Sequence, residues 1–140
     1  MDCTMLNEFL FNNPADVLLG KLLDKSALYQ RVISANVANV GTPGYRRIGV
    51  SFDEKLKSAL ESSLGKLKRT NPRHLPDPYI LENIEPEVVQ IENGYWNGIN
   101  NVSIDEEMVE LAKNQLDFTI ASRLLNSRFT ALRNAIRGRR

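Results

Sequence analysis

Histidine and cysteine, the side chains most often used in catalytic and metal centres, each occur once in this chain of 140 residues. His74 lies between two prolines in the segment 72–76, and Cys3 stands near the N-terminus. A structural zinc site takes about four such ligands, and a nucleophile needs a base beside it. A hydrolase that uses His74 is therefore a weak hypothesis, and an exposed loop histidine explains the residue better. A single cysteine also excludes a disulfide within the chain.

Charged side chains gather in three places, although the net charge is only +1. Four of the six residues from Asp105 to Glu110 are acidic, which suits the positive end of a helix dipole. The basic residues gather in two groups, Lys66, Lys68, Arg69 and Arg73, and Arg137, Arg139 and Arg140. Solvated loops or helix ends explain these groups more simply than a phosphate site. A basic-tailed helical protein that binds nucleic acid or an anionic surface is kept as an alternative, and its affinity would fall steeply with salt.

Tyr95 and Trp96 stand between Gly94 and Gly98 and could stack on a base or a sugar. A small hydrophobic plug is the simpler interpretation of the two rings. The chain also contains no glycine-rich phosphate loop and no nucleophile elbow. We therefore expect a protein that is not an enzyme and that needs no cofactor and no metal.

The strongest pattern in the sequence is a long amphipathic helix at 104–137. Apolar residues recur alternately every third and fourth position from Ile104 to Ile136, which is the 3.5-residue period of a coiled coil. Ser103 and Glu106 form a capping-box pair at its start, and no glycine or proline interrupts it. The predicted coiled-coil seam of this helix consists of Met108, Leu111, Phe118, Leu125, Phe129, Leu132 and Ile136.

A second long helix is predicted at 14–40, after an N-terminal arm at 1–13. Asn13 suits the N-cap and Pro14 the first helical position. Its seam repeats the same spacing at Leu19, Leu22, Tyr29 and Ile33. Because the two seams have the same period, we expect the helices to pair as a coiled coil.

The central segment, 41–103, is predicted to be rich in loops. Gly41 is interpreted as a left-handed stop of the first helix, and Pro43-Gly44 as the centre of a type II turn. A short extended piece at 46–51, a small helix that begins at Ser51 and carries Leu56, Leu60 and Leu64, and a short strand at 88–91 follow. The expected fold is thus mainly α, with one axial domain and an irregular centre.

Apolar side chains also form a second row on the C-terminal helix, away from the seam. A single partner helix would leave this row exposed, so it predicts contacts beyond the chain. The predicted subunit interface consists of Val109, Leu116, Ile120, Leu124 and Ala131.

Asn36 and Asn39 are three residues apart and therefore share a helix face. One interpretation is a buried amide that fixes the register of the helices. The other is ordinary capping of the helix end with contact to solvent. The spacing alone favours neither.

The segment 35–45 resembles the Ala-Asn-x-x-Asn-x-x-Thr-Pro-Gly-Tyr signature of the bacterial flagellar axial proteins of the rod, hook and hook-associated kind. The matching residues are Ala35, Asn36, Asn39, Thr42, Pro43, Gly44 and Tyr45. The segments 70–75, 107–116 and 124–136 look like those of the proximal rod proteins in this family. One departure lies at 98–103, where Ile99 is added and Ser103 replaces the usual acid.

This resemblance implies a structural subunit of the proximal rod, the base of the tubular drive shaft of the flagellum. It implies export by the flagellar type III apparatus without a cleaved signal peptide, which agrees with an N-terminus that lacks a basic segment before an apolar core. It also implies terminal helices that line the inner tube and are partly unfolded before assembly. The implied partners are copies of itself, other rod subunits, the basal-body protein FliE and the MS-ring or export gate, with no nucleic acid and no membrane span. A neighbouring rod subunit of the same family is the rival interpretation.

Overall fold

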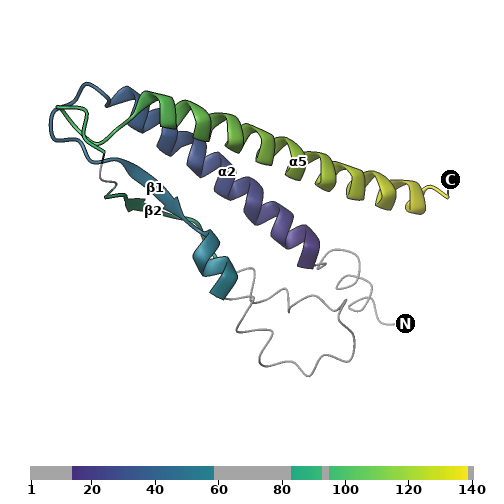
Figure 1. Ribbon diagram of the computed structural model, residues 1–140. Helices are drawn as coiled ribbons and strands as arrows, with labels where there is room; N and C mark the ends of the chain where they lie inside the picture. The colour runs from purple at the N-terminus through teal and green to yellow at the C-terminus, as the bar shows by residue number, and fades with distance from the viewer. Residues whose placement is uncertain (1–13, 59–82, 93–94, 139–140) are drawn as a thin grey trace.

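The computed structural model describes residues 14–58, 83–92 and 95–138, and its main feature is a pair of long helices (Figure 1). Helix α2 comprises Pro14–Ala38 and helix α5 comprises Ile104–Ile136. The helices run antiparallel, because Asp16 contacts Arg128 near one end while Asn36 contacts Glu107 near the other. The expected mainly helical fold with two long helices in contact is confirmed. Within the described ranges, neither helix has a window apolar enough to cross a membrane.

Helix α5 begins at the cap that the sequence predicted. The side chain of Ser103 accepts a hydrogen bond from the backbone N–H of Glu106 at 3.5 Å. Asp105, Glu106 and Glu107 occupy its first turn, where carboxylates are favoured by the helix dipole. At 1.5 Å per residue its 33 residues extend over about 50 Å.

The chain leaves α2 through the turn at 42–45. The backbone N–H of Tyr45 donates to the carbonyl of Thr42 at 3.3 Å, and Gly44 has a φ of 72°. These two observations agree with the predicted type II turn. The predicted left-handed stop at Gly41 is wrong, since among the described glycines only Gly44, Gly98 and Gly138 have positive φ. Helix α2 ends at Ala38 instead, and the backbone N–H groups of Asn39 and Val40 donate to its carbonyls at Ala35, Asn36 and Val37.

We expect Gly44→Ala to destabilise the fold by about 1–2 kcal/mol, because a Cβ atom is strained at positive φ. No heavy atom lies within 4 Å of the added Cβ, so strain is the only cost. Gly41→Ala is the matched control, because that site is equally open and its φ is not left-handed. Urea unfolding of the two variants measures the difference. Equal stability of the two variants would contradict the assigned turn.

Two short strands lie beside α2 and pair antiparallel (Figure 1). Strand β1 comprises Ile48–Ser51 and strand β2 comprises Glu87–Gln90, in a register that places Val50 opposite Val88. A helical segment at 53–58 follows β1 directly. The predicted extended piece, strand and small helix are therefore all present, and the positions of Leu60 and Leu64 lie outside the described residues.

The hydrophobic core is small and lies on the side of α2 that faces β1. Phe52 and Ile84 are buried at its centre. The apolar residues packed around them are Val17, Leu18, Leu22, Val50 and Leu56. Lys25 covers this cluster, since its ammonium nitrogen lies 2.7 Å from Asp53 Oδ1 and 5.8 Å from the centre of the Phe52 ring. None of these core residues comes from α5, so that helix is attached by other contacts.

Candidate assembly surface

The contact between α2 and α5 is largely polar at its buried positions. Asn114 donates from Nδ2 to the backbone carbonyl of Ser26 at 2.9 Å, and both residues are buried. Two turns further along α5, Ala121 is also buried. Its small side chain allows the backbones of α2 and α5 to approach. The helices are therefore joined by specific hydrogen bonds as well as by apolar contact.

The predicted seam is only partly buried in this contact. On α2, Ile33 is buried and Leu19, Leu22 and Tyr29 are half-buried, and on α5, Leu111, Leu125 and Leu132 are half-buried. The remaining seam residues are exposed, at 42% for Met108, 43% for Phe118, 49% for Phe129 and 81% for Ile136. The structure therefore does not bring these four side chains into the interface between the helices.

The buried positions of α5 lie one residue earlier than half of the predicted seam. Glu107, Asn114 and Ala121 face α2; Glu107 comes just before the seam residue Met108, and the other two come just before Gln115 and Ser122, the polar positions of the same 3.5-residue period. One residue corresponds to a rotation of about 100° around a helix. Hydrogen bonding determines this rotation of α5, because the side chains of Glu107 and Asn114 reach their partners only in this rotation. The face of α5 that packs within the chain is thus set by these two residues.

The second apolar row is fully on the surface of the molecule. Val109, Leu116, Ile120 and Leu124 are 53%, 64%, 57% and 52% exposed, and Ala131 is exposed as well. We call these five residues the outer row. Their spacing places Val109 and Leu116 on the side of α5 opposite the residues that face α2, and Ile120, Leu124 and Ala131 on the flank of the helix. An exposed apolar row of this kind typically marks an interaction surface.

A cluster of buried polar groups, which we call the amide junction, joins α2, β1 and α5. It consists of Asn36, Tyr45, Arg47, Asn100, Asn101 and Glu107. Asn36 is only 1% exposed and uses both ends of its amide. Its Nδ2 donates to the carbonyl of Ile48 at 2.8 Å and to Glu107 Oε2 at 3.2 Å. Its Oδ1 accepts from the Ile48 N–H at 3.0 Å and from the Tyr45 hydroxyl at 3.1 Å.

The two interpretations of Asn36 and Asn39, a buried amide that fixes the helices and local capping of the helix end, each apply to one of the residues. Asn36 is a buried amide that fixes β1 and α5 against α2. Asn39 acts locally, because its Nδ2 donates to the carbonyl of Ala35 at 2.8 Å and its Oδ1 accepts from the Thr42 hydroxyl at 3.2 Å. The remaining signature residues, Pro43 and Gly44, form the turn that brings Tyr45 back to Asn36.

Asn100 and Asn101 close the junction from the segment before α5. Asn100 is fully buried, and its Nδ2 lies 3.0, 2.8 and 3.1 Å from the carbonyl oxygens of Asn39, Val40 and Thr42. Where a helix ends, backbone carbonyls are left without hydrogen-bond partners. The side chain of Asn100 donates to three such carbonyls in the residues that directly follow α2. Asn101 accepts from the Arg47 N–H at 2.7 Å and donates to the Ile91 carbonyl at 2.9 Å. The start of α5 is therefore tied to the end of α2 and to the sheet.

An ion pair lies at the centre of the junction. Arg47 Nε is 2.5 Å from Glu107 Oε1, and the two side chains are 13% and 1% exposed. Burial alone lowers the pKa of Arg47, but the hydrogen bond and the charge of Glu107 outweigh it and raise that pKa above its usual value. Burial, followed by the charge of Glu107, also raises the pKa of Tyr45. Arg47 therefore stays charged and Tyr45 stays neutral at neutral pH.

Arg47, Glu107, Asn100 and Asn101 were not identified from the sequence as site residues. Glu107 was assigned to the helix dipole together with its exposed neighbours, since an acid in the first turn has that simple explanation. Asn100 and Asn101 lie in the segment 98–103, which the sequence distinguishes only by its departure from the family pattern. The available signal was the pair of adjacent amides before a long helix, together with the amides of the signature at the end of the other helix.

Tyr29 makes the contact between the helices sensitive to alkaline pH. Its hydroxyl donates to Glu110 Oε2 at 3.2 Å, and burial first, then the charge and the hydrogen bond of Glu110, raise the pKa of Tyr29 to about 12. Because this pKa is raised on folding, the stabilisation is present below pH 10 and is lost as the pH rises through about 12.

We expect the free energy of unfolding to fall over this pH interval, and to fall less in Tyr29→Phe. Unfolding by urea at pH 8 to 11.5 measures this, with Tyr95→Phe, at an exposed tyrosine, as the control. An identical pH dependence in Tyr29→Phe and in the native chain would contradict the assignment.

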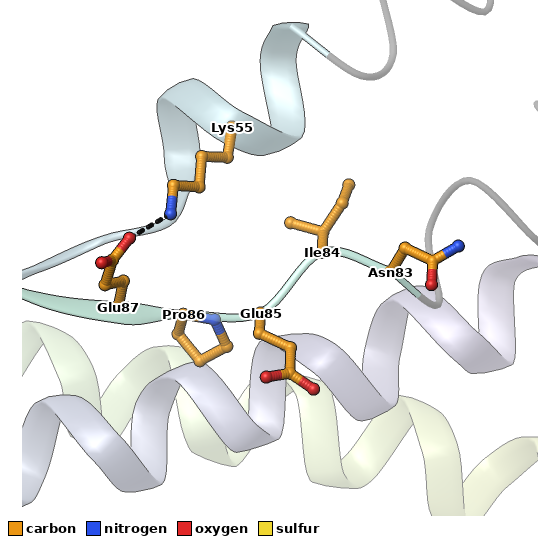
Figure 2. Close-up of a pocket in the computed structure, with 6 residues that line it drawn as sticks. All are labelled: Lys55, Asn83, Ile84, Glu85, Pro86 and Glu87. Atoms are coloured by element: carbon orange, nitrogen blue, oxygen red, sulfur yellow. Dashed lines mark hydrogen bonds and ion pairs between the residues drawn. The ribbon is translucent and has the colours of Figure 1, made fainter.

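Hollows on the surface offer no set of side chains suited to catalysis. Figure 2 shows one of about 470 Å³, where Lys55 forms an ion pair with Glu87 and where Ile84 and Glu85, in the segment before β2, point in opposite directions. Its other lining residues are Asn83 and Pro86. Within the part of the chain that the structure describes, no group of three His, Cys, Asp or Glu residues is placed to hold a metal ion. The positions of His74, Cys3 and the basic group at 66–73 lie outside the described residues.

Tyr95 and Trp96 do not form the hydrophobic plug that the sequence suggested. They are 43% and 64% exposed. Trp96 lines a hollow of about 390 Å³ together with Tyr45, Arg46 and Glu92.

Comparison with known proteins yields one consistent group of relatives. The chain is 32% identical over 120 residues to the flagellar basal body rod protein FlgB of Bacillus subtilis strain 168, covering 86% of this chain and 91% of the relative. It is 31% identical over 110 residues to the FlgB of Aquifex aeolicus, covering 78% and 82%. It is 25% identical over 121 residues to the FlgB of Salmonella typhimurium, covering 83% and 88%. No family model matches the chain.

Proposed function

The chain belongs to the FlgB family of flagellar basal body rod proteins, and we propose that it packs against neighbouring rod subunits through the outer row of α5. It is a structural subunit of the proximal rod and not an enzyme. The observation that carries the proposal is the exposure of the outer row, whose four large side chains are each more than half exposed. In a rod, neighbouring subunits can cover such an apolar surface.

The energetics of the outer row favour a stable contact. Burying a leucine, isoleucine or valine side chain contributes about 1.5–3 kcal/mol. The outer row offers four of them along one side of a rigid helix, so little side-chain or backbone order has to be gained on association. Lys113 lies between Val109 and Leu116 on this face, whereas Leu116, Ile120 and Leu124 follow one another four residues apart with no charged side chain at the row positions between them. The row therefore suits the lateral packing of one helix against another.

The amide junction supports this assembly from within the subunit. It fixes α5 relative to α2 and the sheet through buried hydrogen bonds, so the outer row is presented at a defined angle. The residues of the predicted seam that the chain itself leaves exposed, Met108, Phe118, Phe129 and Ile136, extend the available apolar surface around α5. We propose that they pack against a neighbouring subunit after assembly, while Leu111, Leu125 and Leu132 stay within the chain.

The neighbours proposed for this surface are copies of the same chain, other proximal rod subunits and FliE, with the MS-ring or export gate beneath them. Delivery by the flagellar type III apparatus belongs to the same proposal. These finer assignments rest on the family to which the chain belongs and on the likeness of its helices to those of proximal rod proteins.

Site-specific photocrosslinking tests the proposal. A photoreactive amino acid is placed at Leu124 in the outer row, and basal bodies are purified from cells after irradiation. We expect adducts between this chain and rod subunits, and no adduct when the purified monomer is irradiated at the same position. A second position, Lys57, lies outside the helix pair and is the control for random labelling. Assembled basal bodies that contain the chain but give no Leu124 adduct would contradict the proposed surface.

A further inference from the structure

The two ends of α5 carry opposite charges. The segment 104–120 contains five carboxylates and one lysine, whereas the segment 121–138 contains four arginines and no carboxylate. A helix dipole accounts for charges in the first and last turns only. Arg123 and Arg128 lie well before the last turn, so the dipole does not explain the basic half of the helix.

Several of these charges have no partner within the described part of the chain. Asp105 and Glu106 are exposed, and so are Arg133 and Arg137, and no ion pair joins any of the four to another described residue. In contrast, Glu107 is paired with Arg47 in the amide junction. Unpaired charges of opposite sign are therefore presented at opposite ends of one rigid rod (Figure 1).

Each end also exposes an apolar side chain beside its charges. Val109 is 53% exposed and lies three and four residues after Glu106 and Asp105, which places the three side chains together on the helix surface. They line a hollow of about 420 Å³ with Arg47, Glu110 and Lys113. At the other end, Ile136 is 81% exposed and lies next to Arg133 and Arg137.

The basic end of α5 projects past its partner helix. Arg128 Nε lies 2.5 Å from Asp16 Oδ1, two residues after the start of α2 at Pro14. Pro14 and Ala15 precede Asp16 in the antiparallel pair, so the residues of α5 from about Ala131 to Ile136 extend beyond the first residue of α2. Among the described residues, none covers the apolar and basic tip formed by Arg133, Ile136 and Arg137, which are all exposed.

We propose that the basic end of α5 in one copy, formed by Phe129, Arg133, Ile136 and Arg137, docks on the acidic end of α5 in the next copy, formed by Asp105, Glu106 and Val109. The inference rests on the proposed rod function and adds a second contact to the lateral one. The charges select a second copy, because each end is complementary to the opposite end and repels its own kind. Such a contact joins two different surfaces, so it is heterologous and produces an open, polar row of subunits.

Charge reversal tests this contact. Arg133→Glu/Arg137→Glu makes both ends acidic, and Asp105→Lys/Glu106→Lys makes both ends basic. We expect the native chain to self-associate in a manner that weakens as salt rises. Each double variant alone should associate at least about tenfold more weakly, because like charges then face each other. An equimolar mixture of the two variants should recover association, which sedimentation velocity and light scattering measure at 50 and 500 mM salt.

The matched control is Arg31→Glu/Lys57→Glu, which reverses two exposed cations away from the ends and should associate like the native chain. Circular dichroism confirms that each variant keeps its helices, and the single Arg133→Glu variant replaces the double variant if the latter unfolds. The proposal is overturned if the native chain shows no salt-sensitive association, if the reversed variants associate like it, or if mixing restores nothing. The lateral contact is read separately from the Leu124 adducts in basal bodies, so either proposal can fail without the other.

Discussion

Replacing Glu107 with alanine is expected to destabilise the folded chain by about 3–5 kcal/mol. The substitution leaves the guanidinium of Arg47, only 13% exposed, without the carboxylate that lies 2.5 Å away. It also removes an acceptor from the buried amide of Asn36. Breaking a buried ion pair is costly because the remaining charge stays out of water without compensation. Urea unfolding followed by circular dichroism measures the change.

Glu106→Ala is the matched control for this prediction. Glu106 is the adjacent acid in the first turn of α5, but it is exposed and contributes mainly through the helix dipole, about 0.3–1 kcal/mol. Glu107→Gln should lie between the two, because it keeps an acceptor for Asn36 and loses the charge that Arg47 requires. If Glu106→Ala and Glu107→Ala cost the same, the amide junction does not hold α5 in place as the structure indicates.

Ile120→Asp and Leu124→Asp are expected to abolish rod assembly while leaving the monomer folded. Both side chains are more than half exposed in the single chain, so a carboxylate there remains in water and the helix pair is undisturbed. In a packed interface the same carboxylate would be buried without a partner, at a cost of several kcal/mol. Swimming in soft agar and the content of purified basal bodies report assembly, and circular dichroism of the purified variant reports the fold.

Asn126→Asp is the control for these variants, because it adds the same charge to an exposed position of α5 outside the outer row. It should support assembly and swimming. Normal rods built from Ile120→Asp and Leu124→Asp would show that the outer row is not an interface.

Local rules were sufficient to predict most of the fold. The cap at Ser103, the turn at Pro43-Gly44 and the two strands each depend on a few adjacent residues, and the structure contains all of them. The lengths of α2 and α5 followed from their apolar period and from the absence of helix breakers. These features need no knowledge of what lies across the molecule.

The rotation of α5 could not be predicted in this way. The apolar period alone places Met108 in the interface between the helices, whereas the structure buries its neighbour Glu107. That choice depends on Arg47 and Asn36, which lie 60 and 71 residues away in the sequence. A buried polar group needs a hydrogen-bond partner. The rotation of α5 that gives two buried polar groups their partners is therefore preferred over the rotation that would bury Met108. Asn36 of the signature has the same explanation, because its partners lie in β1, in the turn at 42–45 and in α5.

The amide junction and the outer row have complementary roles in this account. The junction holds α5 rigidly against α2 and the sheet, which leaves the opposite side of the helix free for contact. Rod subunits that join through one helix face need that face at a constant angle. The same buried hydrogen bonds that define the monomer therefore also hold in place the surface that we propose for assembly.

A high-resolution image of the assembled basal body tests the central claim most directly. We predict that Leu116, Ile120 and Leu124 of each copy are buried against a neighbouring rod subunit, with α5 keeping the rotation that buries Glu107 and Asn114 within the chain. An image in which these three side chains face open solvent, inside or outside the rod, would contradict the account.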